Sequence, residues 1–397
     1  MVLPKGKSAK RLFSAALSLF ILFASYLISN VSIPVPDEMS VLRDLDIVKE
    51  IGGWNTDSIP EEVLLVNVAY DKQLIDFYKH DIPVGKVAIT DRGKLLDFLQ
   101  QAKEANNYRY IMLDVFFEQG YESEQDSALF PLIASMDRIV ISTHQNAQLQ
   151  DSILYSKAAN ADYTITWQET SFVHYQFLRN DTLTVPLQMY KDMTGESITK
   201  KGWFFFSNDR LCLNGITLKL PIRVSEDYTE EEGLGRYNML NLGVDLLDTL
   251  TSVAADIDGK IVVVGDFEND VHDTYLGSQP GSLICLNAYY ALVRGDHILY
   301  GNGGSILIFY LLIAIVYYLL SMAYLNGITL TSVVQNPWLK IGLSLVGTNT
   351  LFLTISIIAY ISPLNIVYNI WLPVTVFFIL DLVANKIYQP IKQQQVQ

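Results

Sequence analysis

The sequence contains four long runs of apolar residues. They cover residues 12–29, 303–325, 341–361 and 366–384, and the one charged residue within them is Asp381, near the end of the last run. A helix that crosses the hydrocarbon core of a membrane needs roughly 20 apolar residues. We therefore expect four membrane-spanning helices, of which the first is marginal in length.

The first run has two interpretations. Residues 1–11 form a leader with four Lys or Arg residues, and a basic leader precedes cleaved signal peptides and uncleaved anchors alike. No clear small-x-small cleavage site follows residue 29. We therefore interpret the run as an uncleaved anchor for residues 30–302.

The basic residues outside residues 30–302 predict how the chain crosses the membrane. Besides the leader, they are Lys340, between the second and third runs, and Lys386 and Lys392, in the tail of residues 385–397. Lys and Arg concentrate on the cytoplasmic side of membrane proteins. Because all of these residues fall on one side after four crossings, we expect both chain ends in the cytoplasm and residues 30–302 outside it.

Within residues 30–302, segments of strand length alternate with helical patterns. Four continuous apolar segments are typical of strands buried on both faces, namely residues 62–69, 108–117, 138–142 and 260–265. Residues 91–106, with Asp91 as the cap, and residues 124–136 have helical spacing. We also expect helices over residues 240–254 and 282–294, the latter capped near Ser282. This alternation predicts a parallel sheet with crossover helices.

The middle of this segment has a different pattern. Asn214-Gly215 lies between alternating residues, which predicts a two-residue hairpin over residues 211–218. Residues 203–206 are aromatic, and we expect them in the core or on a hairpin face. The fold class is therefore an α/β domain, mostly parallel sheet with an antiparallel hairpin portion, joined to one N-terminal and three C-terminal membrane helices.

Charge separates the predicted outer segment from the rest of the chain. Residues 30–302 carry 21 basic and 41 acidic residues, a formal charge of −20, whereas the remainder carries +6. The chain has a pI near 4.8 and a mean hydropathy of +0.23. The acidic balance argues against nucleic-acid binding, which requires a basic face. Because half of the residues are hydrophobic, the composition also argues against disorder.

The order of these segments resembles the CHASE2 family of extracytoplasmic sensor domains. The motifs that carry the resemblance are LLVNVAYD ending at Asp71, ITDRGKLLDFL with Arg92, YIMLDVFF with Asp114, Asp126 at the next helix, Asp273-Thr274, Pro280-Gly281 and Asn287. Three hydrophobic runs follow them, as in that family. The sequence departs from the family pattern at Asn67, where an acidic residue is common, and in the absence of the prolines of a Pro-x-x-Arg segment.

The resemblance implies a sensor in a bacterial inner membrane, with its main domain in the periplasm. Family members often continue into a cytoplasmic signalling enzyme, whereas only residues 385–397 follow the last run here. We therefore expect a separate protein partner to receive the signal through the membrane helices. The alternatives are a structural scaffold of the cell envelope, or a subunit of a membrane complex, and an extracytoplasmic hydrolase that uses carboxylates.

Four residues are candidates for binding a small ligand: Asp71, Arg92, Asp114 and Asp273. The first three are expected near the carboxyl ends of strands or the starts of helices, and open parallel sheets bind ligands at that edge. Arg92 would bind anionic or polar groups. The alternative is that Arg92 forms an internal ion pair with Asp71 or Asp114.

Other chemistry has little support in the sequence. Asp270, His272 and Asp273 suggest a metal cluster, but a divalent metal needs three or four convergent ligands, and a capped turn is the simpler interpretation. The G-x-G-x-x-G, G-x-S-x-G and P-loop motifs are missing. We therefore expect no metal, no cofactor and no enzymatic activity. Cys212 and Cys285 would be able to form a disulfide outside the cytoplasm, but buried free thiols are the simpler interpretation.

Two polar residues in the predicted membrane helices are candidates for contact with a partner. Asn349 belongs to a stripe of small and polar residues that allows helices to approach closely. Asp381 is a carboxylate in a membrane helix, and such residues are often functional. For Asp381 the alternative is a position at the cytoplasmic interface, paired with Lys386 or reached by water.

Overall fold

The computed structural model describes residues 4, 6–30, 43–44, 47, 51, 60–79, 82–144, 147–162, 174–222, 239–247, 252–275, 277–299, 305–328, 336–361 and 371–394. The chain divides into two compact units. We call residues 50–297 the α/β unit, and residues 1–49 with 298–397 the helical unit. Each is described separately below.

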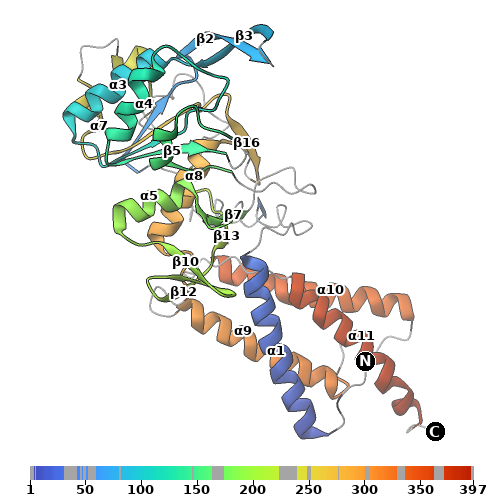
Figure 1. Cartoon of the computed structure of the whole chain (residues 1–397). Helices are drawn as coiled ribbons and strands as arrows, with labels where there is room; N and C mark the ends of the chain where they lie inside the picture. The colour runs from blue at the N-terminus through green and yellow to red at the C-terminus, as the bar shows by residue number, and fades with distance from the viewer. Residues whose placement is uncertain are drawn as a thin grey trace. The chain divides into compact units, whose positions relative to one another are not determined.

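A six-stranded parallel sheet forms the centre of the α/β unit (Figure 1). Every pair of neighbouring strands in it runs parallel, which confirms the predicted sheet. In spatial order the strands are β14 (Met239–Asn241), β1 (Val63–Asn67), β15 (Ile261–Gly265), β4 (Tyr110–Leu113), β5 (Ile139–Thr143) and β6 (Ala158–Asn160). All residues of β1, β4 and β15 are buried, as their continuous apolar sequences predict.

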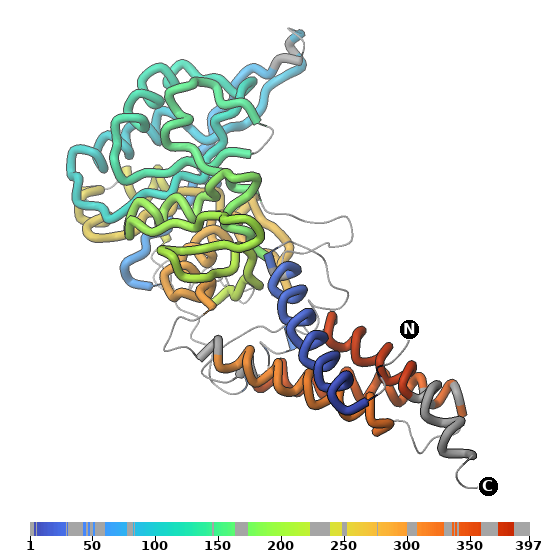
Figure 2. Tube along the Cα trace, turned by 60° about the horizontal axis from the view of Figure 1, so that its bottom comes forward, coloured from blue at the N-terminus to red at the C-terminus, as the bar shows by residue number. Residues whose placement is uncertain are grey.

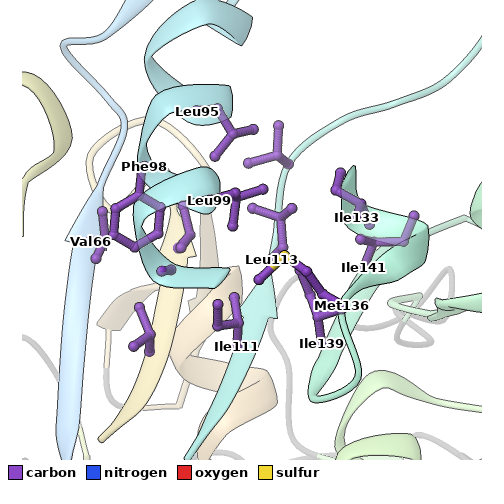
Figure 3. Close-up of a cluster of buried hydrophobic side chains, with 14 of the residues drawn as sticks. Val66, Leu95, Phe98, Leu99, Ile111, Leu113, Ile133, Met136, Ile139 and Ile141 are labelled. Carbon is purple, nitrogen blue, oxygen red and sulfur yellow. The ribbon is translucent and has the colours of Figure 1, made fainter. Parts of the chain in front are cut away.

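Helices cover both faces of this sheet. On one face lie α3 (Arg92–Ala105), α4 (Asp126–Ser135) and α7 (Val253–Ile257), and on the other lie α5 (Val185–Thr194) and α8 (Gly281–Arg294). The predicted cap of α3 is confirmed, because Asp91 Oδ1 accepts a hydrogen bond from the backbone N–H of Lys94 at 3.0 Å. Figure 3 shows the core between α3, α4 and the strands, which includes Val66, Leu95, Phe98, Leu99, Ile111, Leu113, Ile133, Met136, Ile139 and Ile141.

Several antiparallel pairs surround the sheet, which confirms the predicted antiparallel portion. They are β2 (Lys72–Lys79) with β3 (Ile82–Thr90), β7 (His174–Gln176) with β13 (Gly215–Thr217), β8 (Leu178–Arg179) with β9 (Thr182–Leu183), β16 (Val271–Thr274) with β17 (Gly277–Pro280), and the three-stranded sheet of β10 (Ile198–Lys201), β11 (Phe204–Ser207) and β12 (Arg210–Cys212). The sequence did not predict the β2–β3 ribbon.

The predicted hairpin over residues 211–218 is wrong. β12 pairs with β11, and β13 pairs with β7, so the two strands flanking Asn214 belong to different sheets. The turn between β11 and β12 is instead Asn208-Asp209, with φ of 47° and 61°, as a type I′ turn requires. The Asn214 side chain binds the backbone of β8 instead, because it accepts a hydrogen bond from Leu178 N at 2.7 Å and donates one to Leu178 O at 2.9 Å.

Two further expectations need correction. Residues 240–254 are not one helix, because residues 239–241 form the edge strand β14. The π-helix η2 (Leu242–Leu247) and then α7 follow it, and residues 248–251 lie outside the described residues. Pairing with β1 overrides the local helical pattern there.

Ser282 does not cap α8, because its hydroxyl donates to Asp114 Oδ2 at 2.9 Å.

The helical unit contains four long helices that pack against one another (Figures 1 and 2). They are α1 (Lys7–Ser29), α9 (Ser305–Leu325), α10 (Pro337–Ile361) and α11 (Trp371–Gln394). Among the described residues, three segments are long and apolar enough to cross a membrane: Lys7–Ile28, Ile308–Leu325 and Ile341–Ile358. In the fourth helix the apolar segment Leu372–Ala384 is shorter, and residues 366–370 lie outside the described residues. The structure therefore indicates a membrane protein, and the four-crossing topology stays a prediction.

We predict that Gly265→Ala destabilises the α/β unit. A Cβ at this position would lie 2.1 Å from Ser282 Oγ and 3.1 Å from Ser282 Cβ, so α8 would have to move away from β15. Such overpacking costs about 1–3 kcal/mol of unfolding free energy. Thermal unfolding of the full chain in detergent measures this loss. Adding Ser282→Ala should recover part of it, and equal losses in the single and double variants would contradict the proposed clash.

Candidate ligand-binding site

A cavity of 470 Å³ opens at the carboxyl edge of the parallel sheet. Five strands contribute side chains within three residues of this end: Val68 after β1, Asp266 after β15, Asp114 to Phe116 after β4, Ser142 and His144 at β5, and Ala161 after β6. Lys72, Tyr121, Asp270, His272, Gly281 and Cys285 are also in the lining. Open parallel sheets bind ligands at this edge, so the cavity lies where the fold places binding sites.

Asp114 is the central polar group of the cavity. It follows β4 directly, and Ser282 Oγ, in the first turn of α8, donates a hydrogen bond to its Oδ2 at 2.9 Å. Gly265 permits this approach because it has no side chain. Burial raises the pKa of Asp114, and the negative charge of Asp270 raises it further. Hydrogen bonds with Ser142 and Ser282 and the charge of His144 oppose this rise in pKa, but among the described residues Asp114 has no ion pair.

A second carboxylate lies at the N-terminus of α8. Asp270 Oδ2 lies 3.0 Å from the place where a Cβ of Gly281 would be. Its other oxygen, Oδ1, is 3.0 Å from His272 Nε2. Helix N-termini attract anions because their first N–H groups are unsatisfied. Since Asp270 already occupies this position, an anionic ligand would meet negative charge there.

The opposite part of the rim is an ion pair. Lys72 Nζ is 2.7 Å from Asp266 Oδ2, and Asp266 Oδ1 also accepts a hydrogen bond from Asn269 N at 2.8 Å. Burial opposes ionisation of Asp266, but the hydrogen bonds from Lys72 and Asn269 outweigh it and lower its pKa. Asp266 and Lys72 therefore neutralise each other, unlike Asp114.

Aromatic rings form one wall of the cavity. Phe116 and Tyr121 pack edge to face with their centroids 5.1 Å apart, and the His144 ring lies 6.1 Å from that of Phe116. His144 Nδ1 is 2.7 Å from Asp162 Oδ1, which fixes the orientation of the ring. The wall therefore presents aromatic faces, which attract cations as well as apolar groups.

Arg92 supports this wall from behind and does not line the cavity. Its side chain is wholly buried, its guanidinium lies 4.3 Å from the centroid of the Phe117 ring, and its Nη2 donates to the carbonyl of Phe116. Its ion pair is with Asp126, Nε to Oδ1 at 3.5 Å. The expected ion pair with Asp71 or Asp114 is therefore wrong. Burial lowers the pKa of Arg92 to about 10, and Asp126 opposes that shift.

The other two predicted ligand-binding residues also lie outside the cavity lining. Asp71 is buried between two elements: its Oδ1 pairs with Lys94 Nζ at 2.7 Å, and its Oδ2 accepts from Gly243 N at 3.0 Å. Asp273 is exposed and accepts a hydrogen bond from Ser278 Oγ at 2.8 Å. Of the four candidates, the structure places only Asp114 in the cavity.

Sequence reasoning missed most of the other lining residues. Asp266 follows a predicted strand directly, so the rule that selected Asp114 would also have selected it. For Asp270 and His272 the sequence suggested a metal cluster or, more simply, a capped turn, and not a ligand cavity. Among the described residues, no three His, Cys, Asp or Glu side chains are grouped closely enough to hold a metal ion. No sequence pattern indicated that Lys72 lines the cavity, because the β2 strand that carries it was not predicted.

The two cysteines are buried free thiols, as the simpler interpretation predicted. Cys285 lines the cavity, and burial raises its pKa. Burial also raises the pKa of Cys212, to about 12. Both are therefore protonated at neutral pH, and a protonated thiol is a poor nucleophile.

The two polar candidates in the helical unit have different environments. Asn349 is half-buried in α10. Asp381 is wholly buried in α11, where Phe377, Leu380 and Ala384 belong to the apolar cluster of this unit. Its position is therefore internal to the unit rather than exposed at an interface. The expected pairing with Lys386 concerns a side chain outside the described residues.

Comparison with known proteins leaves the site to be interpreted from its own geometry. No protein-family model matches the chain, and no curated protein or solved structure matches it either.

We predict opposite stability effects for two Asp→Asn changes in the cavity. Because the folded-state pKa of Asp114 lies above its ordinary 3.8, its stabilising contribution is greatest at low pH and falls as the pH rises through that pKa. Asp114→Asn should therefore raise the melting temperature at pH 7. The folded-state pKa of Asp266 is lowered, so its contribution is present above pH 3.8 and is lost as the pH falls.

Asp266→Asn should accordingly lower the melting temperature at pH 7, and the difference from the unmodified chain should shrink as the pH falls below 3.8. Thermal unfolding of both variants between pH 3 and pH 7 tests the pair. A lower melting temperature for Asp114→Asn at pH 7 would show that its charge is compensated, contrary to the description above.

Proposed function

We propose that this chain is a membrane-anchored binding protein that senses a small ligand outside the cytoplasm and passes a signal to a separate partner. The observation that carries the proposal is the cavity at the carboxyl edge of the sheet, with residues from five strands around it. Its volume is within the range of small-molecule sites, roughly 300–1,000 Å³. The three apolar helices support attachment to a membrane.

The lining favours a ligand with a protonated amine. Asp114 is a carboxylate without a cationic partner among the described residues, and Asp270 places a second negative charge at the start of α8. An amine would bind Asp114 and offset the cost of burying its charge. The faces of Phe116 and Tyr121 add favourable interactions with a cation. This replaces the anionic ligand expected when Arg92 was assigned to the site.

One helix connects the cavity with the point where the chain leaves the α/β unit. Gly281 and Cys285 of α8 line the cavity, and α8 ends at Arg294, three residues before His297, the last residue of the unit. Its 14 residues span about 21 Å at 1.5 Å each. If the ligand binds the unit more tightly when α8 is in one of two positions, binding would favour that position. The shift of α8 would then move the residues that precede the membrane span of α9.

The resemblance to CHASE2 sensors supports the same function. The expected location is a bacterial inner membrane with both chain ends in the cytoplasm. The partner would be a protein that contacts the membrane helices, with Asn349 as the partly exposed candidate.

We predict that amines raise the melting temperature of the full chain. The probes are putrescine, spermidine, ethanolamine and lysine, with acetate, citrate and glucose as the contrasting set. A ligand at 100 times its Kd stabilises the folded state by about 2.7 kcal/mol. Asp114→Asn should abolish the response, because it removes the charge that pairs with the amine.

Asp273→Asn is the matched control, since Asp273 is an exposed carboxylate outside the cavity, and it should keep the response. Stabilisation by the anions alone, or an amine response that survives Asp114→Asn, would contradict the proposed ligand class. No response to any probe would count against the sensor function.

The scaffold alternative is favoured by one observation. The β2–β3 ribbon exposes three large apolar side chains: Leu74 at 67%, Ile82 at 64% and Val84 at 58%. Exposed apolar strands are typical of protein contacts. Cross-linking in native membranes followed by mass spectrometry distinguishes the two functions. Recovery of one stoichiometric partner through this ribbon, lost in Leu74→Ser and unaffected by amines, would favour the scaffold.

A further inference from the structure

We propose that the β10–β11 hairpin is an anchor at the membrane interface, which inserts Trp203 and Phe204 among lipid headgroups and directs Lys200 and Lys201 at lipid phosphates. This inference does not depend on the cavity or on its ligand. It concerns a segment whose aromatic residues we expected in the core or on a hairpin face.

The hairpin geometry presents Trp203 at the tip. The register pairs Lys201 with Phe204, so Gly202-Trp203 is a two-residue turn. Gly202 has φ of 65°, as the first central residue of a type II′ turn requires. The turn therefore projects the indole beyond the ends of both strands, and the tip residues are consecutive in sequence.

The two faces of the hairpin differ in burial. Ile198, Ser207 and Phe205 lie on the buried face, at 2%, 0% and 9% exposure. Lys200 is paired with Phe205 on that same face but is exposed. Phe204 and Lys201 lie on the other face and are exposed, Phe204 at 39%, while Trp203 at the tip is 68% exposed. The two lysines therefore flank the tip on opposite faces. An exposed Trp and Phe next to Lys is the composition found at membrane–water interfaces, where amphipathic rings and cations are both favourable.

The charge of the hairpin is opposite to that of its unit. Residues 198–212 carry three cations and one carboxylate, whereas the α/β unit, residues 50–297, carries 19 basic and 37 acidic residues, a formal charge of −18. Lys201 Nζ lies 3.2 Å from Asp209 Oδ1, in the turn at the other end of β11, and the two side chains are 61% and 92% exposed. Such exposed pairs are weak, so Lys201 remains able to exchange Asp209 for a phosphate. Cations in an acidic unit complement anionic lipids.

The covalent chain keeps this sheet near a membrane span. Leu213, the residue after β12, donates its N–H to the carbonyl of His297 at 2.8 Å. His297 also packs against Phe177 and Tyr190. Seven residues separate His297 from Ser305, the first residue of α9. Since consecutive extended residues span at most about 3.6 Å each, His297 lies within about 29 Å of α9. Among possible occupants of the tip we therefore choose the lipid surface that α9 is expected to enter.

The test uses fluorescence of Trp203 in the full chain. The other four Trp residues (Trp54, Trp167, Trp338 and Trp371) are changed to Phe, and the chain is reconstituted in vesicles of phosphatidylethanolamine and phosphatidylglycerol with brominated acyl chains. Bromine quenches Trp only on close approach. We expect loss of most of the Trp203 emission and little quenching by aqueous acrylamide. The matched control moves the Trp to another exposed site of the α/β unit, by Trp203→Phe with Tyr155→Trp. Its emission should be quenched strongly by acrylamide and little by the brominated lipid.

Charge variants and hydrogen exchange complete the test. Lys200→Glu with Lys201→Glu should restore acrylamide access to Trp203. Hydrogen exchange is measured on the unmodified chain, because this avoids any folding defect of the variants. Amide exchange in residues 201–204 should be slower in nanodiscs with phosphatidylglycerol than in nanodiscs with phosphatidylcholine alone. The Asn180-Asp181 turn between β8 and β9 is the internal control and should not change. Three results would overturn the proposal. They are quenching of Trp203 by acrylamide but not by bromine, quenching by neither, and equal amide exchange in the two kinds of nanodisc.

Discussion

Burial of the central strands on both faces is the constraint on which the α/β unit depends. Because β1, β4 and β15 have no exposed residues, polar side chains from these strands reach water only beyond their ends. The strands are parallel, so their carboxyl ends meet at one edge, and Asp114 and Asp266 come together there from segments far apart in sequence. The same burial makes the uncompensated charge of Asp114 costly. A residue kept at such a cost is typical of a functional site.

Much of this sheet was predictable because its signal is local. Four continuous apolar segments correspond to β1, β4, β5 and β15, and the Asp91 cap is set by residues within one turn of α3. β14 was not predictable from its own residues. Its pattern is helical, and pairing with β1 determines its conformation. The β2–β3 ribbon was missed for another reason: apolar and polar residues do not alternate along its two strands, so no apolar period marks them.

Only one of the four candidate ligand-binding residues reaches the cavity, and the physical reason is the helix that follows the ribbon. Arg92 is the first residue of α3 and turns toward the core, where Phe117 and Asp126 receive it. Lys94, two residues later, pairs with Asp71 and holds it against η2. Position at the sheet edge therefore does not determine whether a polar residue meets the ligand. The partner that the fold brings to it decides this, Asp126 for Arg92 and Lys94 for Asp71, and no sequence pattern revealed these partners.

The hairpin and its unit carry opposite charges, and distance decides which of them acts on a lipid surface. The formal charge of −18 on residues 50–297 would repel an anionic membrane, but charges are screened beyond about 8 Å at physiological ionic strength. The acidic residues are spread over the whole segment, whereas Lys200 and Lys201 are adjacent at one tip. Close to lipid phosphates the two lysines therefore outweigh the more distant carboxylates. The sheet that carries the hairpin is bonded to His297, the residue that α8 connects to the cavity. An anchored tip would thus fix one end of the path along which a ligand-induced shift of α8 reaches the membrane helices.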